Sequence, residues 1–330
     1  MPLSEIRQIG IVLPVYDDWT AAQALLARID RALDSISCRA RILFVDDGSP
    51  HGPERDWPSG LRNLSDISIL HLRRNLGHQR AIALGLVHVY ENWRGIEAVV
   101  VMDGDGEDRP EDIPALLEVF AARDGGQVVF AARAKRLESA SFQFFYRAYR
   151  VLHKMLTGVA VRVGNFSVLP PKALETLMVS PELWNHYAAA IFRTRIPHIS
   201  IPLARGSRLA GRSKMNFVSL LVHGFSAISV FSDQVAARLL AASVGATVAA
   251  VLAAALVAAL HFFARWAIPA WLPYAGALLL VVLAPALIVS LALVFIIASG
   301  RAASSFLPIR DAAFFIDRVE SIARVGAARG

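Results

Sequence analysis

Two long stretches in the C-terminal third of the chain carry no charged residue, and they limit what the chain can fold into. Between Arg238 and Arg265 there are 26 residues without Asp, Glu, Lys or Arg, and between Arg265 and Arg301 there are 35. A helix of 26 residues is about 39 Å long, whereas the hydrocarbon core of a bilayer is about 30 Å thick. Helices of soluble proteins rarely lack a polar face for so long. The stretches predict two transmembrane helices, over about 236–262 and 272–298, rather than a buried helical pair.

Basic residues lie on one side of this predicted hairpin. Arg and Lys precede the first span and follow the second, whereas the connection, about Ala264–Leu272, holds one Arg, two Trp and one Pro. The positive-inside rule therefore places both the long N-terminal region and the C-terminal tail in the cytoplasm. We expect an integral protein of a bacterial inner membrane.

The overall charge of the chain limits the classes of binding partner to be expected. A net charge of +7 suits nucleic acid, anionic lipid or a phosphorylated substrate. No zinc-finger spacing or RNA-binding aromatic signature accompanies the charge, so we expect no nucleic acid partner. Cys38 is the single cysteine, which excludes an intramolecular disulfide and a cysteine metal cluster.

Four short apolar runs in the first half of the chain each end in polar residues. The runs are Ile9–Leu13, Arg41–Val45, Ala98–Met102 and Gln127–Phe130, and stretches of helical spacing such as Thr20–Ile36 and Gln79–Tyr90 lie between them. Strands that alternate with helices predict an α/β domain with a mostly parallel sheet. Ligands of such sheets bind at the carboxyl ends of the strands, so we expect the four polar clusters to meet in one cleft.

The third of these clusters is acidic and reads Asp103-Gly-Asp-Gly-Glu107. Carboxylates held close together repel one another, and a cation is their usual stabiliser. Carboxylate oxygens suit Mg²⁺ or Mn²⁺, and Mg²⁺ typically takes one or two of them together with substrate phosphates. A solvated acidic turn is the alternative. A helix-loop-helix calcium loop is disfavoured, because its twelfth position would be Pro114 instead of Glu.

Two further segments have the composition of helices close to a membrane. Residues 141–157 carry an aromatic and aliphatic stripe beside a basic stripe, which is typical of an amphipathic helix in the membrane interface. A surface helix packed on the domain core is the alternative. The apolar-rich segment 214–235 then leads to the first span.

The polar motifs follow one another in an informative order. They are Pro14-x-Tyr16-x-Asp18, Asp46-Asp-Gly-Ser49, Asn75-x-Gly77, Asp103-x-Asp105-x-Glu107, Arg133 and Arg208-x-x-Gly211-x-Ser213-Lys214. In this order, with two apolar spans behind them, they resemble family 2 glycosyltransferases of the GT-A fold. More narrowly, they resemble the dolichyl-phosphate mannose synthase and bacterial polyprenyl-phosphate glycosyltransferase branch.

The resemblance covers about Ile6–Ser299 and implies a fold. We expect an α/β GT-A domain, Rossmann-like with a mostly parallel sheet, followed by amphipathic interface helices and two C-terminal transmembrane helices. The chain then divides into a GT-A domain over 1–213, a juxtamembrane helix over 214–235, the transmembrane pair within 236–299 and a cytoplasmic tail over 300–330. The tail has no counterpart in the resemblance.

The resemblance also implies a donor site for a nucleoside-diphosphate sugar. The residues expected to frame the base and ribose are Pro14, Tyr16, Asp18 and Asp47. Asp103 would contact the donor, Asp105 and Glu107 would hold Mg²⁺ or Mn²⁺, and Arg208 and Lys214 would lie over the diphosphate on a mobile loop. The catalytic set is therefore Asp103, Asp105, Arg208 and Lys214. The alternatives are an ordinary half-buried aromatic for Tyr16, a plain turn for Asp46 and Asp47, and a solvated basic loop for Arg208 and Lys214.

The expected acceptor is a polyprenyl phosphate. A lipid monophosphate is already largely ionised near neutral pH, so it needs cations instead of a general base. Arg133 and Arg147 would supply them. The implied reaction is an inverting transfer of one hexose in a membrane-bound enzyme; whether that enzyme is a homo-oligomer is left open.

Several positions depart from the resembled pattern. Glu107 stands where relatives often have Gln, and Val151 stands where a Ser often follows the acceptor Arg. His51 replaces a frequent Asp, and Asn165 stands where Asp is common. The remaining histidines expected to be surface or packing residues are His78, His153 and His223.

Two other functions compete with this hypothesis. A transferase acting on a lipid or glycan hydroxyl would need a general base, for which Asp103, Glu107 and Asp108 are the candidates. A non-catalytic membrane module would bind nucleotide or metal without turnover. The nucleotide base, the sugar and the polyprenol are not encoded in these short motifs.

Overall fold

A computed structural model describes residues 2–54, 56–133, 151–159, 163–204, 206, 208–209, 224–264, 267–300 and 306–323. The chain forms two compact units. The sheet unit comprises Met1–Ala140, Val161–Val230 and Phe306–Gly330, and the hairpin unit comprises Ser141–Ala160 and Phe231–Ser305. The residues that precede and follow the two long apolar stretches thus belong to the same unit.

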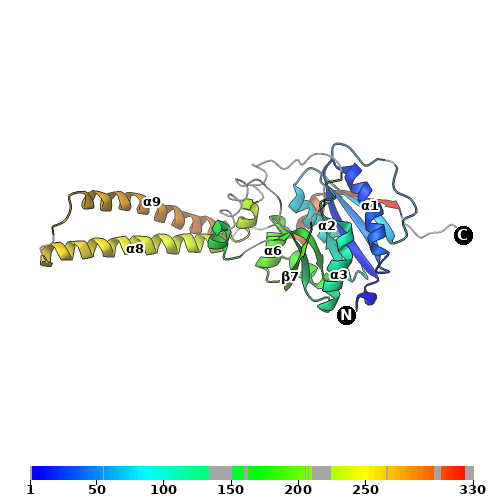
Figure 1. Cartoon of the computed structure of the whole chain (residues 1–330). Coiled ribbons are helices and arrows are strands. Elements are labelled where there is room, and N and C mark those ends of the chain that lie inside the picture. Colours follow the sequence, from blue (N-terminus) through cyan, green and yellow to red (C-terminus); the bar gives the residue numbers. More distant parts are fainter. Residues whose placement is uncertain are drawn as a thin grey trace. The chain divides into compact units, whose positions relative to one another are not determined.

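The sheet unit (Figure 1) is built on an eight-stranded sheet. The strand order is β7-β5-β6-β4-β1-β2-β3-β8. Its strands are β1 (Gln8–Val15), β2 (Arg39–Asp46), β3 (Leu64–Leu72), β4 (Ala98–Val101), β5 (Val128–Arg133), β6 (Val163–Leu169), β7 (His198–Leu203) and β8 (Ile316–Ala323). Strand β1 runs parallel to β2 and β4, β2 to β3, and β5 to β7, whereas β6 and β8 are antiparallel to their neighbours. The predicted α/β fold with a mostly parallel sheet is confirmed.

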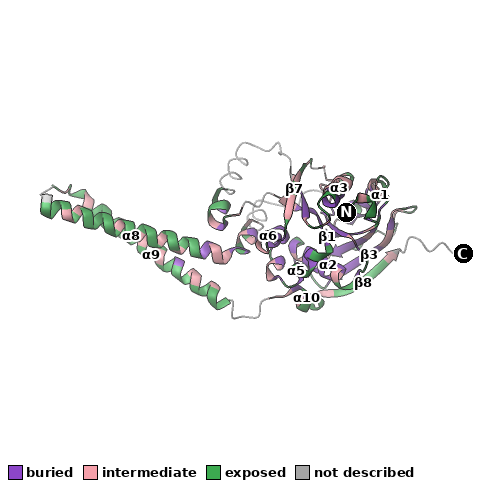
Figure 2. Ribbon diagram, turned by 90° about the horizontal axis from the view of Figure 1, so that it is seen from below, coloured by how far each residue is buried: buried purple, intermediate pink, exposed green. Residues whose placement is uncertain are grey.

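Helices cover both faces of this sheet. They are α1 (Trp19–Leu33), α2 (His78–Asn92), α3 (Ile113–Ala122), α5 (Pro171–Met178), α6 (Tyr187–Arg193) and α10 (Pro308–Asp311), with short 3₁₀ turns η1 (Leu3–Glu5), η2 (Pro110–Asp112), η3 (Pro181–Trp184) and η4 (Ala312–Phe314). One apolar cluster contains residues of α1 and α3, and a second contains residues of α2, α5 and α6. Figure 2 shows these two sets on opposite sides of a largely buried sheet.

The central strand β1 shows why its sequence is apolar at nearly every position. Ile11 and Leu13 enter the cluster with α1, while Val12 between them enters the cluster with α2. Successive side chains of a strand point to opposite faces, so a strand covered on both faces needs a continuous apolar run. Helix α2 lies close to this strand at Gly85, where a Cβ would come within 2.6 Å of the Val12 side chain.

The C-terminal segment has more structure than the sequence predicted. Residues 308–323 form α10, η4 and β8 of the sheet unit, and β8 pairs with β3 in the register Ile69–Glu320 and His71–Arg318. The charged residues of this segment indicate a solvated tail by composition. At a sheet edge, however, one face of a strand stays in solvent and accepts such charges.

The hairpin unit contains the two long apolar helices, α8 (Ser232–Ala264) and α9 (Trp271–Gly300). Their membrane-like stretches have mean hydropathies of 2.3 and 3.1, and their apolar surfaces are largely exposed (Figure 2). Exposing an apolar surface of this extent to water is energetically unfavourable, so the two helices indicate a membrane protein. The hydroxyls of Ser243 and Ser290 lie 3.1 Å apart and join α8 to α9.

Only parts of the two predicted membrane-adjacent helices can be placed. Residues 151–157 and 224–229 are helical. Residues 230–235 are also described and include the first residues of α8, whereas 141–150, with Arg147, and 214–223, with Lys214 and His223, lie outside the described residues. Arg238 at the start of α8 donates to the carbonyl oxygens of Met155 and Leu156, at 3.0 and 3.1 Å.

Candidate active site

Three of the predicted polar clusters meet at the carboxyl ends of β1, β2 and β4. The Asp47 N–H donates to the Val15 carbonyl at 2.9 Å, and the Asp17 N–H donates to the Ser49 hydroxyl at 2.8 Å. The acidic segment lies against the same strand end, because a Cβ on Gly104 would come within 2.9 Å of the Pro14 carbonyl oxygen. The predicted convergence is therefore present for three of the four clusters; the fourth ends in Arg133, whose side chain lies outside the described residues.

Asp47 holds the backbone of the Asn75-x-Gly77 motif. Its carboxylate accepts the N–H groups of Leu76 and Gly77 at 2.7 and 2.9 Å. Burial raises the pKa of Asp47 above its usual value, and these hydrogen bonds offset the rise only in part. Gly48, inside the Asp46-Asp-Gly-Ser49 motif, has φ of +72°, and a Cβ there would clash with the Asn75 nitrogen. Each carboxylate oxygen has a second lone pair, so Asp47 retains capacity for a ligand.

Tyr16 and Asp18 occupy the turn between β1 and α1. The Tyr16 side chain is exposed at the surface, where a ring can offer a stacking face. Asp18 forms an ion pair with Arg208, whose guanidinium also lies 3.7 Å from an Asp105 carboxylate oxygen. Arg208 thus joins two carboxylates of different predicted clusters.

Backbone hydrogen bonds hold the segment around Arg208 against the acidic cluster. The Gly206 N–H donates to the Glu107 carbonyl at 2.9 Å, and the Leu209 N–H donates to the Asp105 carbonyl at 3.0 Å. Gly106 has φ of +85°, and a Cβ there would come within 2.4 Å of the Leu209 side chain. The first residues of the late basic motif therefore pack directly against the acidic loop, residues 103–107.

The acidic loop is also ordered from within. The Glu107 N–H donates to Asp105 Oδ1, and the Asp103 N–H donates to Asp108 Oδ2, both at 2.9 Å. Among the described residues, no three side chains of the types His, Cys, Asp and Glu gather as a metal-binding group. The oxygen donors of Asp105 and Glu107 fit a hard cation that takes one or two carboxylates and completes its shell with substrate phosphates.

His78 is exposed at the surface, as expected, but it also contacts two residues of the candidate site, which the sequence did not predict. Its Nε2 lies 3.1 Å from Asp103 Oδ1 and 2.9 Å from Asn165 Nδ2. Desolvation by neighbouring atoms would by itself lower the pKa of His78, but the carboxylates of Asp103, Asp108 and Asp105 together raise it. Its position directly after Asn75-x-Gly77, at the start of α2, was the sequence signal that could have indicated this role.

Asn165 on β6 connects His78 and Asp103 to other residues of α2 and α6. Its Oδ1 accepts a hydrogen bond from Gln79 at 3.1 Å, and the other end of the Gln79 amide accepts the Tyr187 N–H at 2.7 Å. The Tyr187 hydroxyl in turn lies 2.7 Å from the Ser167 hydroxyl. The Asn165 side chain is thus held by two residues of α2 and by Asp103, whose Oδ1 lies 3.4 Å from the Asn165 amide nitrogen.

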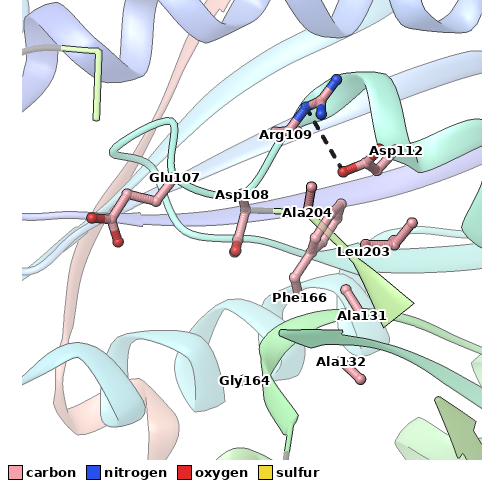
Figure 3. A pocket seen from close by; sticks show the side chains of 10 residues that line it. All are labelled: Glu107, Asp108, Arg109, Asp112, Ala131, Ala132, Gly164, Phe166, Leu203 and Ala204. Atoms are coloured by element: carbon pink, nitrogen blue, oxygen red, sulfur yellow. Dashed lines mark ion pairs between the residues drawn. The ribbon is translucent and has the colours of Figure 1, made fainter. Parts of the chain in front are cut away.

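A small pocket lies beside Glu107 and Asp108 (Figure 3). The ends of β5 and β7 and the start of β6 line its other side, and an ion pair between Arg109 and Asp112 borders it. Its volume of about 20 Å³ suits one or two water molecules but not a hexose. Arg133 ends β5 next to this pocket, but its side chain, like Arg147 and Lys214, lies outside the described residues.

Comparisons with known proteins agree with this architecture. Residues 10–177 match the glycosyl transferase family 2 profile. The chain is 27% identical over 233 residues to the uncharacterized glycosyltransferase YkcC of Bacillus subtilis, covering 70% of each chain. It is 29% identical over 231 residues to the undecaprenyl-phosphate 4-deoxy-4-formamido-L-arabinose transferase of Erwinia tasmaniensis, covering 67% of each.

A solved structure shows the same fold. Glucosyl-3-phosphoglycerate synthase from Mycobacterium tuberculosis, crystallised with Mn²⁺, UDP-glucose and phosphoglyceric acid, superposes with a TM-score of 0.51 at 16% identity. The match covers 71% of this chain and 81% of that one, and it agrees with the predicted GT-A fold. Since the family profile spans half of the chain, the protein is a glycosyltransferase and belongs to glycosyl transferase family 2.

Proposed function

We propose that this enzyme transfers one sugar, with inversion, from a nucleoside-diphosphate sugar to a polyprenyl phosphate at the cytoplasmic face of a bacterial inner membrane. The observation that carries the proposal is the meeting of Arg208 with Asp18 and Asp105 at the strand ends of a chain that also has two membrane-long apolar helices. The transferase from Erwinia, whose name specifies an undecaprenyl-phosphate acceptor, supports it.

The donor's nucleotide binds at the β1 and β2 ends. Tyr16 stacks on the base, and Pro14, Asp18 and Asp47 border the base and ribose. The Asp47 carboxylate also holds the backbone of Leu76 and Gly77. Asp103, fixed by His78 and Asn165, contacts the sugar or its diphosphate. The carboxylates accept hydrogen bonds from hydroxyl or base N–H groups, which orients the donor for attack.

The diphosphate binds between the acidic loop and the segment that begins at Gly206. Asp105 and Glu107 hold Mg²⁺ or Mn²⁺, which when bound neutralises the charge that builds up on the leaving diphosphate. Arg208 is near enough to Asp105 to reach the same phosphates, and Lys214 follows it on the same loop. Arginine can grip phosphate with two parallel hydrogen bonds, while lysine adds a point charge.

The acceptor phosphate binds through cations. Arg133 at the end of β5 and Arg147 hold the phosphate, whose oxygen attacks the anomeric carbon opposite the leaving diphosphate. The phosphate is ionised near neutral pH, so no side chain has to remove a proton from it. Asp108, one of the candidate bases for a hydroxyl acceptor, accepts the Asp103 N–H.

The connectivity of the chain supports one orientation. The chain leaves the sheet unit before α8 and returns to it at α10 and β8, so both ends of the hairpin face the side on which the sheet unit lies. The concentration of Arg and Lys around these ends places that side in the cytoplasm.

A transfer assay with radiolabelled nucleotide sugars tests the function. Purified full-length protein in detergent should transfer label to undecaprenyl phosphate in the presence of Mn²⁺, and EDTA should stop the transfer. Undecaprenol, which lacks the phosphate, is the matched control acceptor. Transfer to undecaprenol alone would identify a hydroxyl transferase, and donor binding without any turnover would identify a non-catalytic module.

A further inference from the structure

A path of side-chain hydrogen bonds leads from the C-terminal strand β8 into the site. Glu320 on β8 has a carboxylate oxygen 3.2 Å from His71 Nε2 on β3. The other ring nitrogen, Nδ1, lies 2.9 Å from Asp46 Oδ2 at the end of β2. One imidazole thus bridges the last strand of the chain and the Asp46-Asp-Gly-Ser49 motif.

Burial makes Asp46 dependent on this imidazole. Asp46 is 6% exposed and His71 is 7% exposed. A buried carboxylate is costly unless it is paired and hydrogen-bonded, and a buried pair is screened little by salt. The hydrogen bond at one imidazole nitrogen sets which nitrogen carries the proton and how the ring is oriented. Glu320 therefore influences how His71 meets Asp46.

The second oxygen of Asp46 continues the path toward the donor site. It accepts the Ser49 N–H at 3.0 Å, and the Ser49 hydroxyl accepts the Asp17 N–H at 2.8 Å. Asp17 has φ of +52°, a conformation that residues other than glycine rarely adopt. Such a backbone persists only where its surroundings hold it, and the Ser49 hydroxyl is one such contact.

We infer that Glu320 and His71 are positioning residues of the nucleotide subsite: the strand that follows the membrane hairpin fixes, through Asp46 and Ser49, the backbone that presents Tyr16 and Asp18. The inference rests on the proposed donor-binding role of Tyr16 and Asp18. The C-terminal segment then contributes to donor binding by positioning the residues that contact the donor. Its contribution passes through one buried imidazole, not through direct contact with the ligand.

The chain offers a matched control on the same strand. Asp317 of β8 lies 3.4 Å from Arg73 at the end of β3, so it also joins the C-terminal segment to β3. Both of these side chains are exposed. In the part of the chain that the structure describes, neither of them contacts Asp46. If β8 only tethers the sheet edge, loss of Asp317 and loss of Glu320 should have similar effects.

Calorimetric titration of the full-length protein in detergent tests the inference. The probe is whichever of UDP, GDP, CDP, ADP and dTDP most raises the melting temperature of the unmodified protein in Mn²⁺. Glu320→Ala should raise the Kd of this probe about three- to tenfold, the range expected for the loss of one ordinary hydrogen bond. Glu320→Gln keeps an oxygen acceptor for His71 and should recover most of the affinity. Asp317→Ala should stay within about twofold.

A double variant tests whether Glu320 acts through the imidazole. The Kd of His71→Ala/Glu320→Ala should equal that of His71→Ala, because both changes interrupt the same path. In the transfer assay, Glu320→Ala should raise the KM for the donor and leave kcat nearly unchanged.

Equal Kd values for Glu320→Ala and Asp317→Ala would overturn the inference, as would a Glu320→Gln variant as weak as Glu320→Ala. This comparison decides the matter even if His71→Ala does not fold. If none of the five diphosphates binds the unmodified protein, the proposed function is wrong, and the inference falls with it.

Discussion

At the residue scale, Asp105 is the carboxylate on which most of the proposed chemistry depends. It accepts the Glu107 N–H and lies beside Arg208, so its loss removes a proposed metal ligand and a partner of the arginine that we propose binds phosphate. We expect Asp105→Ala to lower kcat by at least about a hundredfold, the effect typical of removing one group that stabilises transition-state charge. Turnover and Mn²⁺ binding would be measured on protein extracted from membranes.

Asp124→Ala provides the control for this variant. Asp124 is exposed beyond the end of α3, away from the strand ends that form the site. Its replacement should leave both turnover and Mn²⁺ binding unchanged. Full activity in Asp105→Ala protein would remove Asp105 from the proposed metal site.

The pH dependence of stability provides a test of His78. Its pKa in the folded protein is raised above the usual 6.5, so its contribution to stability is complete below pH 6.5 and is lost as the pH rises through the folded pKa. The melting temperature of the native protein should therefore exceed that of His78→Gln most at pH 6, and the difference should shrink toward pH 9. The measurement is made in EDTA, so that metal binding does not contribute. A difference that grows with pH would contradict the charged pairing with Asp103.

The acidic motif and the motifs proposed to bind nucleotide were predictable because each follows a buried strand. Carboxylates are energetically unfavourable there unless they are paired or bind a ligand. Strand order then brought them together, as parallel sheets require. The partners of these residues were not predictable. His78, Asp103 and Asn165 lie on three separate elements, and Arg208 meets Asp18 across 190 positions of sequence. Such pairs depend on loop paths that periodicity does not encode.

At the element scale, the acidic loop packs against Gly206 and Leu209. Leu209 occupies the space that a side chain at position 106 would need, and Gly106 has a positive φ. Gly106→Ala should push the segment around Arg208 away from the loop and lower kcat/KM about ten- to a hundredfold, because small displacements of phosphate-binding groups are costly. Leu209→Ala removes the clashing atoms, so the double variant should regain part of the activity in the transfer assay.

The remaining strain at φ of +85° limits how far that rescue can go. A double variant that is no better than Gly106→Ala would show that strain at position 106, rather than contact with Leu209, sets the effect. Gly126→Ala is a suitable control, since it lies beyond α3 and a Cβ there meets its nearest neighbour at 3.6 Å. Its activity should match that of the native protein.

The elements themselves were predictable to different degrees. The strands β1, β2 and β4 stand out as β-branched runs because both of their faces are buried. The edge strand β8 does not, since its charged side chains resemble those of a solvated tail until β3 supplies its hydrogen bonds. The two apolar helices follow from composition alone, because only a membrane-like environment accommodates charge-free segments of this length.

At the scale of the whole molecule, the return of the chain to the sheet unit requires both ends of the hairpin to share one side of the membrane. The single native thiol makes this testable. Cys38 is buried and its pKa is raised to about 12 by burial, so it should not react with maleimides. Ala270→Cys, in the connection between α8 and α9, and Ala313→Cys, in η4, both introduce thiols at exposed positions.

These two cysteines should report opposite sides. In intact bacterial cells a membrane-impermeant maleimide should label Ala270→Cys and spare Ala313→Cys, and inverted membrane vesicles should give the reverse. The native protein, with only Cys38, is the control and should remain unlabelled in both. Labelling of Ala313→Cys from outside the cell would place the sheet unit on the far side of the membrane. A cytoplasmic nucleotide sugar could not reach it there, so this result would contradict both the orientation and the donor supply that the proposed reaction requires.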